Sequence, residues 1–368
     1  EKYTDKFEAM AVAIKETLTS VIGSSVTTIA GFIALCFMSF TLGRDLGIVM
    51  AKGVLLGVLG CVTVLPSLIL VLDKPLQKTK HRSLIPNMGK FAKGIVKIFP
   101  VFLILFAILV TPAYYGYNKA NDEVYYDLGE CLPEDISYVI SNSKLREDFN
   151  IASTHMILVD NGISAKSVKK MIGEMEAVPG VKYVLGLESV IGSRVPQEIL
   201  PDSVKSIVES DRWELLLINS EYKAASDAAG EQIDTLNTIL KKYDENGMVI
   251  GEAPLMKDMI EITGHDFAVV TAVSVIAIFL IILLVEKSIS LPFILIAVIE
   301  VGIFINLGLP HYLGQSMAFI TPICISTIQL GATVDYAILM TTRYKSERIG
   351  GKDKKNAVRT ALYTSIPS

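Results

Sequence analysis

The sequence predicts a polytopic α-helical membrane protein that carries one extracytoplasmic α+β domain of ferredoxin-like form. The chain is 51% hydrophobic, and several apolar runs reach the roughly 20 residues that cross a bilayer. Between two groups of these runs lies a long polar stretch in which strand and helix patterns alternate. The formal net charge of −4 says little, because membrane proteins sort charge by loop, and nothing in it indicates nucleic-acid binding.

Apolar runs and charged stretches divide the chain into six segments. The first spans are expected at about 20–40 and 46–72, separated by a tight turn at Thr41–Asp45. One further span is expected before the polar domain, and a group of three spans is expected after it. In order, the predicted segments are the end of one transmembrane half at 1–72, a basic linker at 73–97, a span at 98–116, the polar domain at 117–264, three spans within 265–343, and a cytoplasmic segment with the start of a further span at 344–368.

Basic residues predict the orientation of these segments. The linker at 73–97 carries seven Lys or Arg residues against the single acid Asp73, and the segment at 344–368 is also rich in Lys and Arg. By the positive-inside rule both lie in the cytoplasm. We therefore expect a multi-pass protein of the plasma membrane whose polar domain is extracytoplasmic.

The polar domain repeats a strand–helix–strand pattern. In each copy an amphipathic helix of period 3.6 lies between two short runs that are rich in β-branched and apolar residues. Two such units predict a small ferredoxin-like sandwich, with an excursion at about 196–208 between them. The expected strands are 155–159, 181–185, 213–219 and 248–250, and the expected helices are 164–176 and 223–243.

Asp335 is the main candidate for function. It lies inside an apolar run long enough to span a bilayer, where a carboxylate costs about 2.5–3.5 kcal/mol unless it is buried in the bundle or protonated. Gly331, one turn earlier, leaves that helix face bare, so a neighbouring helix can approach closely. Tyr336 adds a phenol beside the acid. The alternative is a structural hydrogen bond between helices, which Ser, Thr or Asn would make at lower cost.

Other polar residues in the spans are secondary candidates. Glu300 is expected either to be a second protonatable group or to hydrogen-bond a neighbouring helix. Gln329 is expected to bond across helices. Ser24 and Thr28, in a cluster of hydroxyl residues, either face an acid of a missing part of the protein or pack helices together.

The sequence gives no indication of a metal site, of ATP use or of enzyme catalysis. His155 is expected to start a surface strand and has no Cys or His neighbour, so we expect no metal site. His265 and Asp266 are expected to be a solvated pair at the start of a span. No glycine-rich phosphate loop and no nucleophile with its base are present, so the sequence indicates neither ATP use nor an enzyme, and we expect no cofactor.

A weak internal repeat indicates a duplicated protein. Shifted by 344 residues, Ala13-Ile-Lys and the residues that follow match Ala357-Val-Arg and its successors, at the same distance from an oncoming span. We expect this chain to be about one period of a tandem duplication, with a first-half copy of the Asp335 helix ending just before Glu1. Parallel halves of this kind are a known transporter plan.

The run Gly331-Ala-Thr-Val-Asp335-Tyr336, ending in Arg343, resembles the Gly-x-x-x-Asp-Tyr helix of the resistance-nodulation-division (RND) superfamily, in its MMPL branch. The layout of spans around an outer domain is also similar, over essentially the full length. The resemblance implies a porter-type outer domain and export of lipids, peptides or amphiphilic drugs by proton antiport. It also implies Asp335 and Tyr336 as the proton relay, and a second Asp-Tyr helix that this chain lacks.

Two other functions stay open at this point. Sterol-sensing proteins share a similar arrangement of spans and include lipid sensors, and some relatives of the secretion machinery assist protein export. The expected partners are the lipid bilayer, a hydrophobic or amphiphilic substrate and the missing half of the protein. A homo-oligomer is also open, because the family includes trimers and monomers.

Overall fold

The computed structural model describes residues 5–79, 89–186 and 208–366 of the chain. The chain divides into a helical unit, made of Glu1–Val124 and Thr263–Ser368, and a smaller unit of Tyr125–Ile262. The expected excursion at 196–208 lies almost wholly outside the described residues, as do Lys80 and Arg82 of the basic linker.

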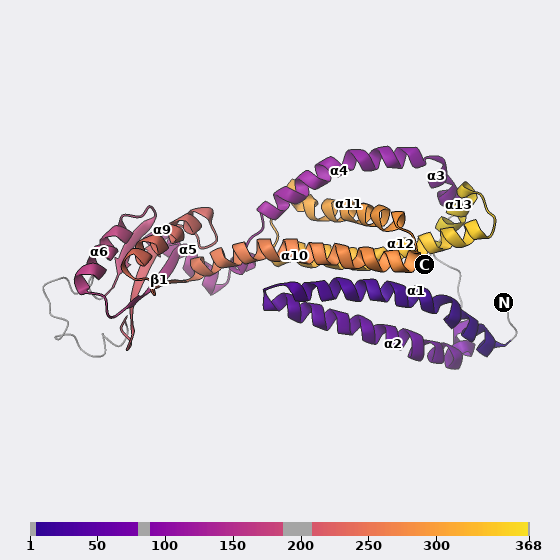
Figure 1. Ribbon diagram of the computed structural model, residues 1–368, viewed down its shortest axis with the longest axis horizontal. Coiled ribbons are helices and arrows are strands. Elements are labelled where there is room, and N and C mark those ends of the chain that lie inside the picture. The colour runs from indigo at the N-terminus through magenta and orange to yellow at the C-terminus, as the bar shows by residue number, and fades with distance from the viewer. Residues whose placement is uncertain (1–4, 80–88, 187–207, 367–368) are drawn as a thin grey trace. The chain divides into compact units, whose positions relative to one another are not determined.

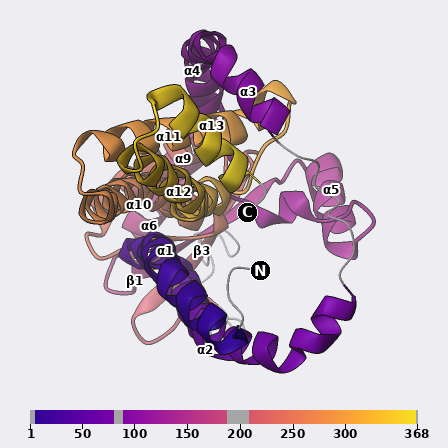
Figure 2. The same ribbon diagram turned by 90° about the vertical axis from the view of Figure 1, so that its right-hand side faces the viewer.

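The helical unit is built from long helices that pack in pairs (Figure 1). Helix α1 packs against both α2 and α12, and α11 packs against both α4 and α12. Figure 2 gives the view along these helices. Their bounds are Lys6–Ala34 for α1, Thr41–Lys78 for α2, Gly89–Lys97 for α3, Phe99–Asp122 for α4, Glu252–Glu286 for α10, Ser290–Tyr312 for α11, Ile320–Ile349 for α12 and Lys354–Ser365 for α13.

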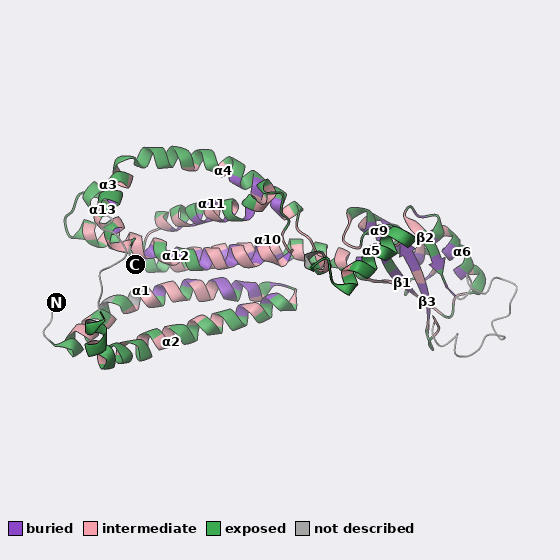
Figure 3. Ribbon diagram, turned by 180° about the vertical axis from the view of Figure 1, so that it is seen from behind, coloured by how far each residue is buried: buried purple, intermediate pink, exposed green. Residues whose placement is uncertain are grey.

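Five helices of the described residues, α2, α4, α10, α11 and α12, are long and apolar enough to cross a membrane. The apolar part of α1 is shorter, at Val21–Phe37, because the first half of that helix is polar. Figure 3 shows α2 and α4 largely exposed, and their exposed residues include many Leu, Ile, Val and Phe side chains. Apolar surface of this extent is typical of helices that face lipid. The chain is therefore a multi-pass membrane protein.

The chain reverses between α1 and α2 earlier than the sequence indicated. A 3₁₀ turn at Leu35–Phe37 is followed by extended backbone at Met38 and Phe40, and α2 begins at Thr41. The expected turn at Thr41–Asp45 is wrong, because these residues form the first turn of α2. The backbone N–H groups at the reversal are held by a side chain distant in sequence, described below, which no local pattern reveals.

The membrane helices extend past the expected spans. Helix α10 starts at Glu252, before the expected start at 265, and α12 continues to Ile349. The residues added are amphipathic or charged, so a hydropathy pattern ends where the apolar run ends, whereas the helical backbone continues in water.

The smaller unit contains a four-stranded antiparallel sheet in the order β2-β3-β1-β4. With one helix after β1 and one after β3, this is the topology of a ferredoxin-like sandwich, as the sequence predicted. The strands are β1 Ser153–Asp160, β2 Val181–Leu185, β3 Trp213–Ser220 and β4 Met248–Gly251. The helices are the short η2 at Leu128–Cys131, α5 Ser137–Phe149, α6 Ala165–Glu176 and α9 Asp227–Tyr243.

Serine N-caps start the two helices that cover this sheet. The Ser164 side chain accepts from the Ser167 backbone N–H at α6, and the Ser226 side chain accepts from the Ala229 N–H at α9. The apolar faces of both helices pack on the inward side chains of β1, β2 and β3 to form one core. This unit thus has its own hydrophobic core, without any need for a disulfide.

Candidate functional site

Asp335 lies where α12 contacts α1. Its Oδ1 accepts a hydrogen bond from the Thr27 hydroxyl at 2.9 Å, and its Oδ2 lies 3.4 Å from the Thr28 hydroxyl. The Ser24 hydroxyl, one turn before Thr28 on the same face of α1, donates to the Val21 carbonyl of its own helix. Among the residues that the structure describes, no Lys or Arg pairs with Asp335, so hydroxyl groups are its polar partners.

Each of these hydroxyls has one proton and more than one acceptor within reach. The Thr27 oxygen lies 2.5 Å from the Ser24 carbonyl as well as near Asp335. The Thr28 oxygen lies 3.3 Å from the carbonyls of both Ser24 and Gly331. A charged carboxylate is the stronger acceptor, whereas a neutral carboxyl competes poorly with a backbone carbonyl. The protonation state of Asp335 therefore decides whether Thr27 bonds to α12 or within α1, whereas Thr28 can also bond to the Gly331 carbonyl of α12.

Two glycines allow α1 and α12 to approach at this level. A Cβ added at Gly31 would lie 3.3 Å from the Gly331 Cα and 3.3 Å from the Thr327 carbonyl. A Cβ added at Gly331 would lie 3.5 Å from the Thr28 Cα, which is an ordinary contact. The structure thus places Gly331 at the closest part of this helix contact, with Gly31 as the tighter of the two positions. This approach brings short Thr side chains within reach of Asp335.

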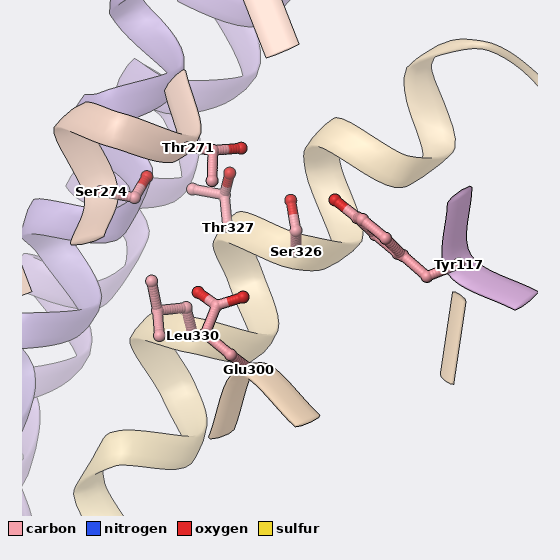
Figure 4. A pocket seen from close by; sticks show the side chains of 7 residues that line it. All are labelled: Tyr117, Thr271, Ser274, Glu300, Ser326, Thr327 and Leu330. Carbon is pink, nitrogen blue, oxygen red and sulfur yellow. The ribbon is translucent and has the colours of Figure 1, made fainter. Parts of the chain in front are cut away.

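Tyr336 lies apart from this cluster. It follows Asp335 in the helix and so points about 100° away, and 70% of its surface is exposed. Gln329 is also separate, because its Oε1 accepts from the Asn306 side chain of α11 at 2.9 Å. Glu300 lines a small cavity between α4, α10, α11 and α12 (Figure 4). The structure therefore brings Ser24, Thr28, Gly331 and Asp335 together, and holds Tyr336, Gln329 and Glu300 elsewhere.

The sequence left the role of the hydroxyl cluster open, which holds Ser25 and Thr27 as well as Ser24 and Thr28. The structure shows that Thr27 and Thr28 face Asp335 of this same chain, across the α1–α12 contact. A helical spacing would have grouped Ser24, Thr27 and Thr28 on one face. No sequence signal identifies the partner, because Thr27 and Asp335 are 308 residues apart.

Two buried carboxylates in the helical unit were missed or misplaced. Asp266 is 1% exposed and accepts from the backbone N–H groups of Ser39 at 2.9 Å and Phe40 at 3.2 Å. The expectation that Asp266 is solvated, drawn from its place at the start of an apolar run, is therefore wrong. Its carboxylate instead holds the reversal of the chain between α1 and α2. Glu286, at the end of α10, is also buried and forms an ion pair with Lys345 of α12 at 2.7 Å.

His155 is likewise not at a surface. It is 0% exposed in the interior of the sheet unit, and its Nε2 lies 3.1 Å from the Gln232 Oε1. Because the Gln232 amide nitrogen donates to the Pro179 carbonyl, its oxygen is left as an acceptor, and His155 carries its proton on Nε2. Burial lowers the pKa of His155 from its ordinary value, which keeps the ring neutral.

The described residues contain no group of three or more His, Cys, Asp or Glu side chains that could hold a metal ion. What the α1–α12 cluster can do is bind and release a proton on one carboxylate and exchange the hydrogen bonds of its hydroxyl neighbours. That chemistry needs neither a nucleophile nor a cofactor.

Comparison with known proteins places this geometry in a family. The model of the MMPL family matches residues 2–91 and 200–368. The membrane protein ActII-3 of Streptomyces coelicolor is 25% identical over 374 residues, covering 95% of this chain and 48% of ActII-3. The sulfolipid-1 exporter MmpL8 of Mycobacterium tuberculosis is 27% identical over 160 residues, covering 40% of this chain and 15% of MmpL8.

The chain thus spans about half the length of ActII-3, and its match to MmpL8 covers a smaller part of that protein. The family match covers both α1 and α12, the two helices that carry the Asp335 cluster. The chain belongs to the MMPL family of RND-type membrane transporters.

Proposed function

We propose that this chain is part of an exporter that moves lipids or other amphiphilic molecules across the plasma membrane, driven by the inward flow of protons. The observation that carries the proposal is the Asp335 carboxylate, which lies within a span-long helix and has the Thr27 and Thr28 hydroxyls of α1 as its partners. A membrane carboxylate is costly to keep charged, so its partners and its protonation are linked. The substrate class is inferred from the similarity to MmpL8, a sulfolipid-1 exporter.

The proton acts by changing which helices are bonded to each other. When Asp335 is charged, Thr27 and Thr28 donate to it and hold α1 against α12. When Asp335 gains a proton, both hydroxyls return to carbonyls, and the Thr27 donor bonds the Ser24 carbonyl within its own helix. Without hydrogen bonds to a charged Asp335, α1 and α12 can then shift relative to each other at the contact between Gly31 and Gly331.

The remaining parts of the proposal concern placement and partners. The sheet unit is the extracytoplasmic domain, because the basic linker at 73–97, which precedes α4, and the basic segment at 344–368, at the end of α12 and beyond, favour the cytoplasm. A second half of the same protein supplies a further Asp-Tyr helix, and Tyr336, exposed here, faces that half. Asp335 and Tyr336 together relay the proton in the assembled transporter.

The test is transport by the full-length protein in lipid vesicles, with and without a pH gradient. Asp335→Asn keeps the size and hydrogen-bonding capacity of the side chain but cannot gain or lose the charge, so export driven by the gradient should fall at least 100-fold. Asp45→Asn, at an exposed position of α2, is the matched control and should export normally. Gradient-driven export by Asp335→Asn would overturn the proposal. Wild-type protein that binds lipid without moving it would favour the sensor function instead.

A further inference from the structure

A small polar cavity lies inside the helical unit, apart from the Asp335 cluster. Four helices contribute to it: α4, α10, α11 and α12. Figure 4 shows the Glu300 carboxylate and the surrounding hydroxyl groups directed into the same space. It has room for about one water molecule. Its polar lining residues are Tyr117, Thr271, Ser274, Glu300, Ser326 and Thr327.

Two hydroxyls of this cavity have no hydrogen-bond partner in the part of the chain that the structure describes. Ser274 is 1% exposed, and both its Oγ and the Thr271 Oγ1 are buried and unpaired. Buried polar groups in proteins are nearly always satisfied, by protein or by ordered water. Two unpaired hydroxyls on neighbouring turns of one helix, directed toward a carboxylate, indicate that a small polar guest occupies the space.

The hydrogen-bonding groups of the lining residues indicate which kind of molecule the cavity can hold. Ser326 and Thr327 both donate their hydroxyl protons to the Ile323 carbonyl, at 3.1 and 2.8 Å, so their oxygens present lone pairs to the cavity. Glu300 adds one carboxylate. The lining is therefore rich in acceptors and has a single titratable acid, which suits a water molecule that carries and passes on a proton.

How the charge of Glu300 is balanced depends on which other charged or titratable groups face it in the cavity. Among the described residues, Tyr117 of α4 is the other titratable group that faces Glu300, and α10 and α12 contribute only the hydroxyls already named and Leu330. No Lys or Arg within 5–79, 89–186 or 208–366 lines the space. Among the described lining residues, the negative charge of Glu300 has no positively charged partner. The carboxylate must therefore be stabilised either by a bound water molecule or by gaining a proton.

We propose that Glu300 and the water it holds with Ser274 and Thr271 form a second proton-binding site, loaded before Asp335 during transport. The proposal rests on the proposed proton-driven export. In the loading step one proton passes from a hydronium ion that enters from outside to a Glu300 carboxylate oxygen, forming one O–H bond, breaking one and leaving a neutral water, with no electron transferred. In the unloading step the same proton returns to the cavity water and reaches Asp335.

The position of the cavity along α12 supports this order. Thr327 precedes Asp335 by eight residues, about 12 Å along the helix axis, toward the end that begins at Ile320. The Thr327 side chain lines the cavity, while its carbonyl lies against Gly31 of α1. Thr327 thus borders both the cavity and the α1–α12 contact. In the proposed orientation the Ile320 end is the extracytoplasmic end, from which protons enter.

The experiment is transport by the full-length protein in vesicles, measured as a function of external pH. Glu300→Gln should lower gradient-driven export about 10-fold or more, and Glu300→Asp should restore part of it. Thr271→Val together with Ser274→Ala should shift the pH at which export is half-maximal while the protein assembles normally. Asn306→Ala is the matched control, since it removes a hydrogen bond between the same helices, α11 and α12, away from the cavity.

Infrared difference spectra between low and high pH supply a readout that a purely structural role would not move. The wild type should show a band from a protonated carboxyl that disappears in Glu300→Gln. Unchanged export, pH profile and spectra in Glu300→Gln, with Asp335→Asn inactive, would overturn this inference and leave the proposed function standing. Dependence of export on Na⁺ rather than on the pH gradient would also overturn it, because the guest would then be a metal cation.

Discussion

The Thr27 hydroxyl lies 2.9 Å from the Asp335 carboxylate, joining two helices whose residues are 308 positions apart in sequence. This bond ties the protonation of one side chain to the packing of α1 on α12. Thr27→Val, which keeps the shape but removes the donor, is expected to lose a hydrogen bond to a charged group, worth about 1.5–3 kcal/mol. Proton-driven export should fall about 10-fold or more.

Thr27→Ser is the matched variant, since it keeps the hydroxyl and loses only a methyl group. It should export at close to the normal rate in the same vesicle assay. Equal loss in both variants would mean that packing, and not the hydrogen bond, is what Thr27 supplies.

The two glycines at the α1–α12 contact should respond differently to alanine. A Cβ at Gly31 meets backbone atoms at 3.3 Å, which cannot move without separating the helices, whereas a Cβ at Gly331 meets its nearest atom at an ordinary 3.5 Å. We expect Gly31→Ala to lower the thermal stability of the detergent-solubilised protein and to reduce export. Gly331→Ala should change either quantity little, and a larger effect at Gly331 than at Gly31 would contradict the packing described here.

Asp266 should matter for stability rather than for proton transfer. Its carboxylate satisfies the backbone N–H groups of Ser39 and Phe40 in a buried position. Asp266→Ala leaves both donors unpaired, at a cost of about 1–3 kcal/mol for each buried group. The melting temperature in detergent should fall by several degrees. Asp122→Asn, at an exposed acid of α4, is the control and should leave the melting temperature nearly unchanged.

The sheet unit should lose stability as the pH falls. Burial lowers the pKa of His155, so in acid the unfolded chain binds a proton that the folded unit resists. The stability from this residue is complete above its unfolded pKa of about 6.5 and is lost as the pH falls below that value. Trp213, the only Trp in this chain, lies in β3 and reports unfolding of this unit by fluorescence.

Urea unfolding of the full chain followed at Trp213 should therefore show a smaller free energy of unfolding at pH 5 than at pH 7. In His155→Gln this difference should shrink, whatever the absolute stability of the variant. His265→Gln, at an exposed histidine, should keep it. A pH dependence that is the same in His155→Gln and in the wild type would assign the effect to other groups.

The sheet unit was the part that the sequence predicted best. Its four strands and the helices α6 and α9 fall within a few residues of the expected positions, and the order of its strands follows from two strand–helix–strand units. Helices η2 and α5 were not predicted. Local patterns suffice for the predicted elements, because alternation and amphipathic spacing mark them and Ser164 marks the start of α6. They do not reveal α5, which buries none of its residues. His155 was misplaced because a strand pattern states which face a residue is on, but not whether helices cover that face.

In the membrane helices, hydropathy located the spans, and Asp335 was identified because a carboxylate in an apolar run is costly wherever it lies. Asp266 and Thr27 could not be assigned, since their roles depend on partners hundreds of residues away. The sequence by itself determined the class of protein, its apolar spans, its sheet unit and its costly acid, because each of these is a property of one continuous stretch. The tertiary structure alone decided which hydroxyls meet Asp335 and which acids are buried, because these depend on how separate helices pack, and packing brings together residues that no local pattern connects.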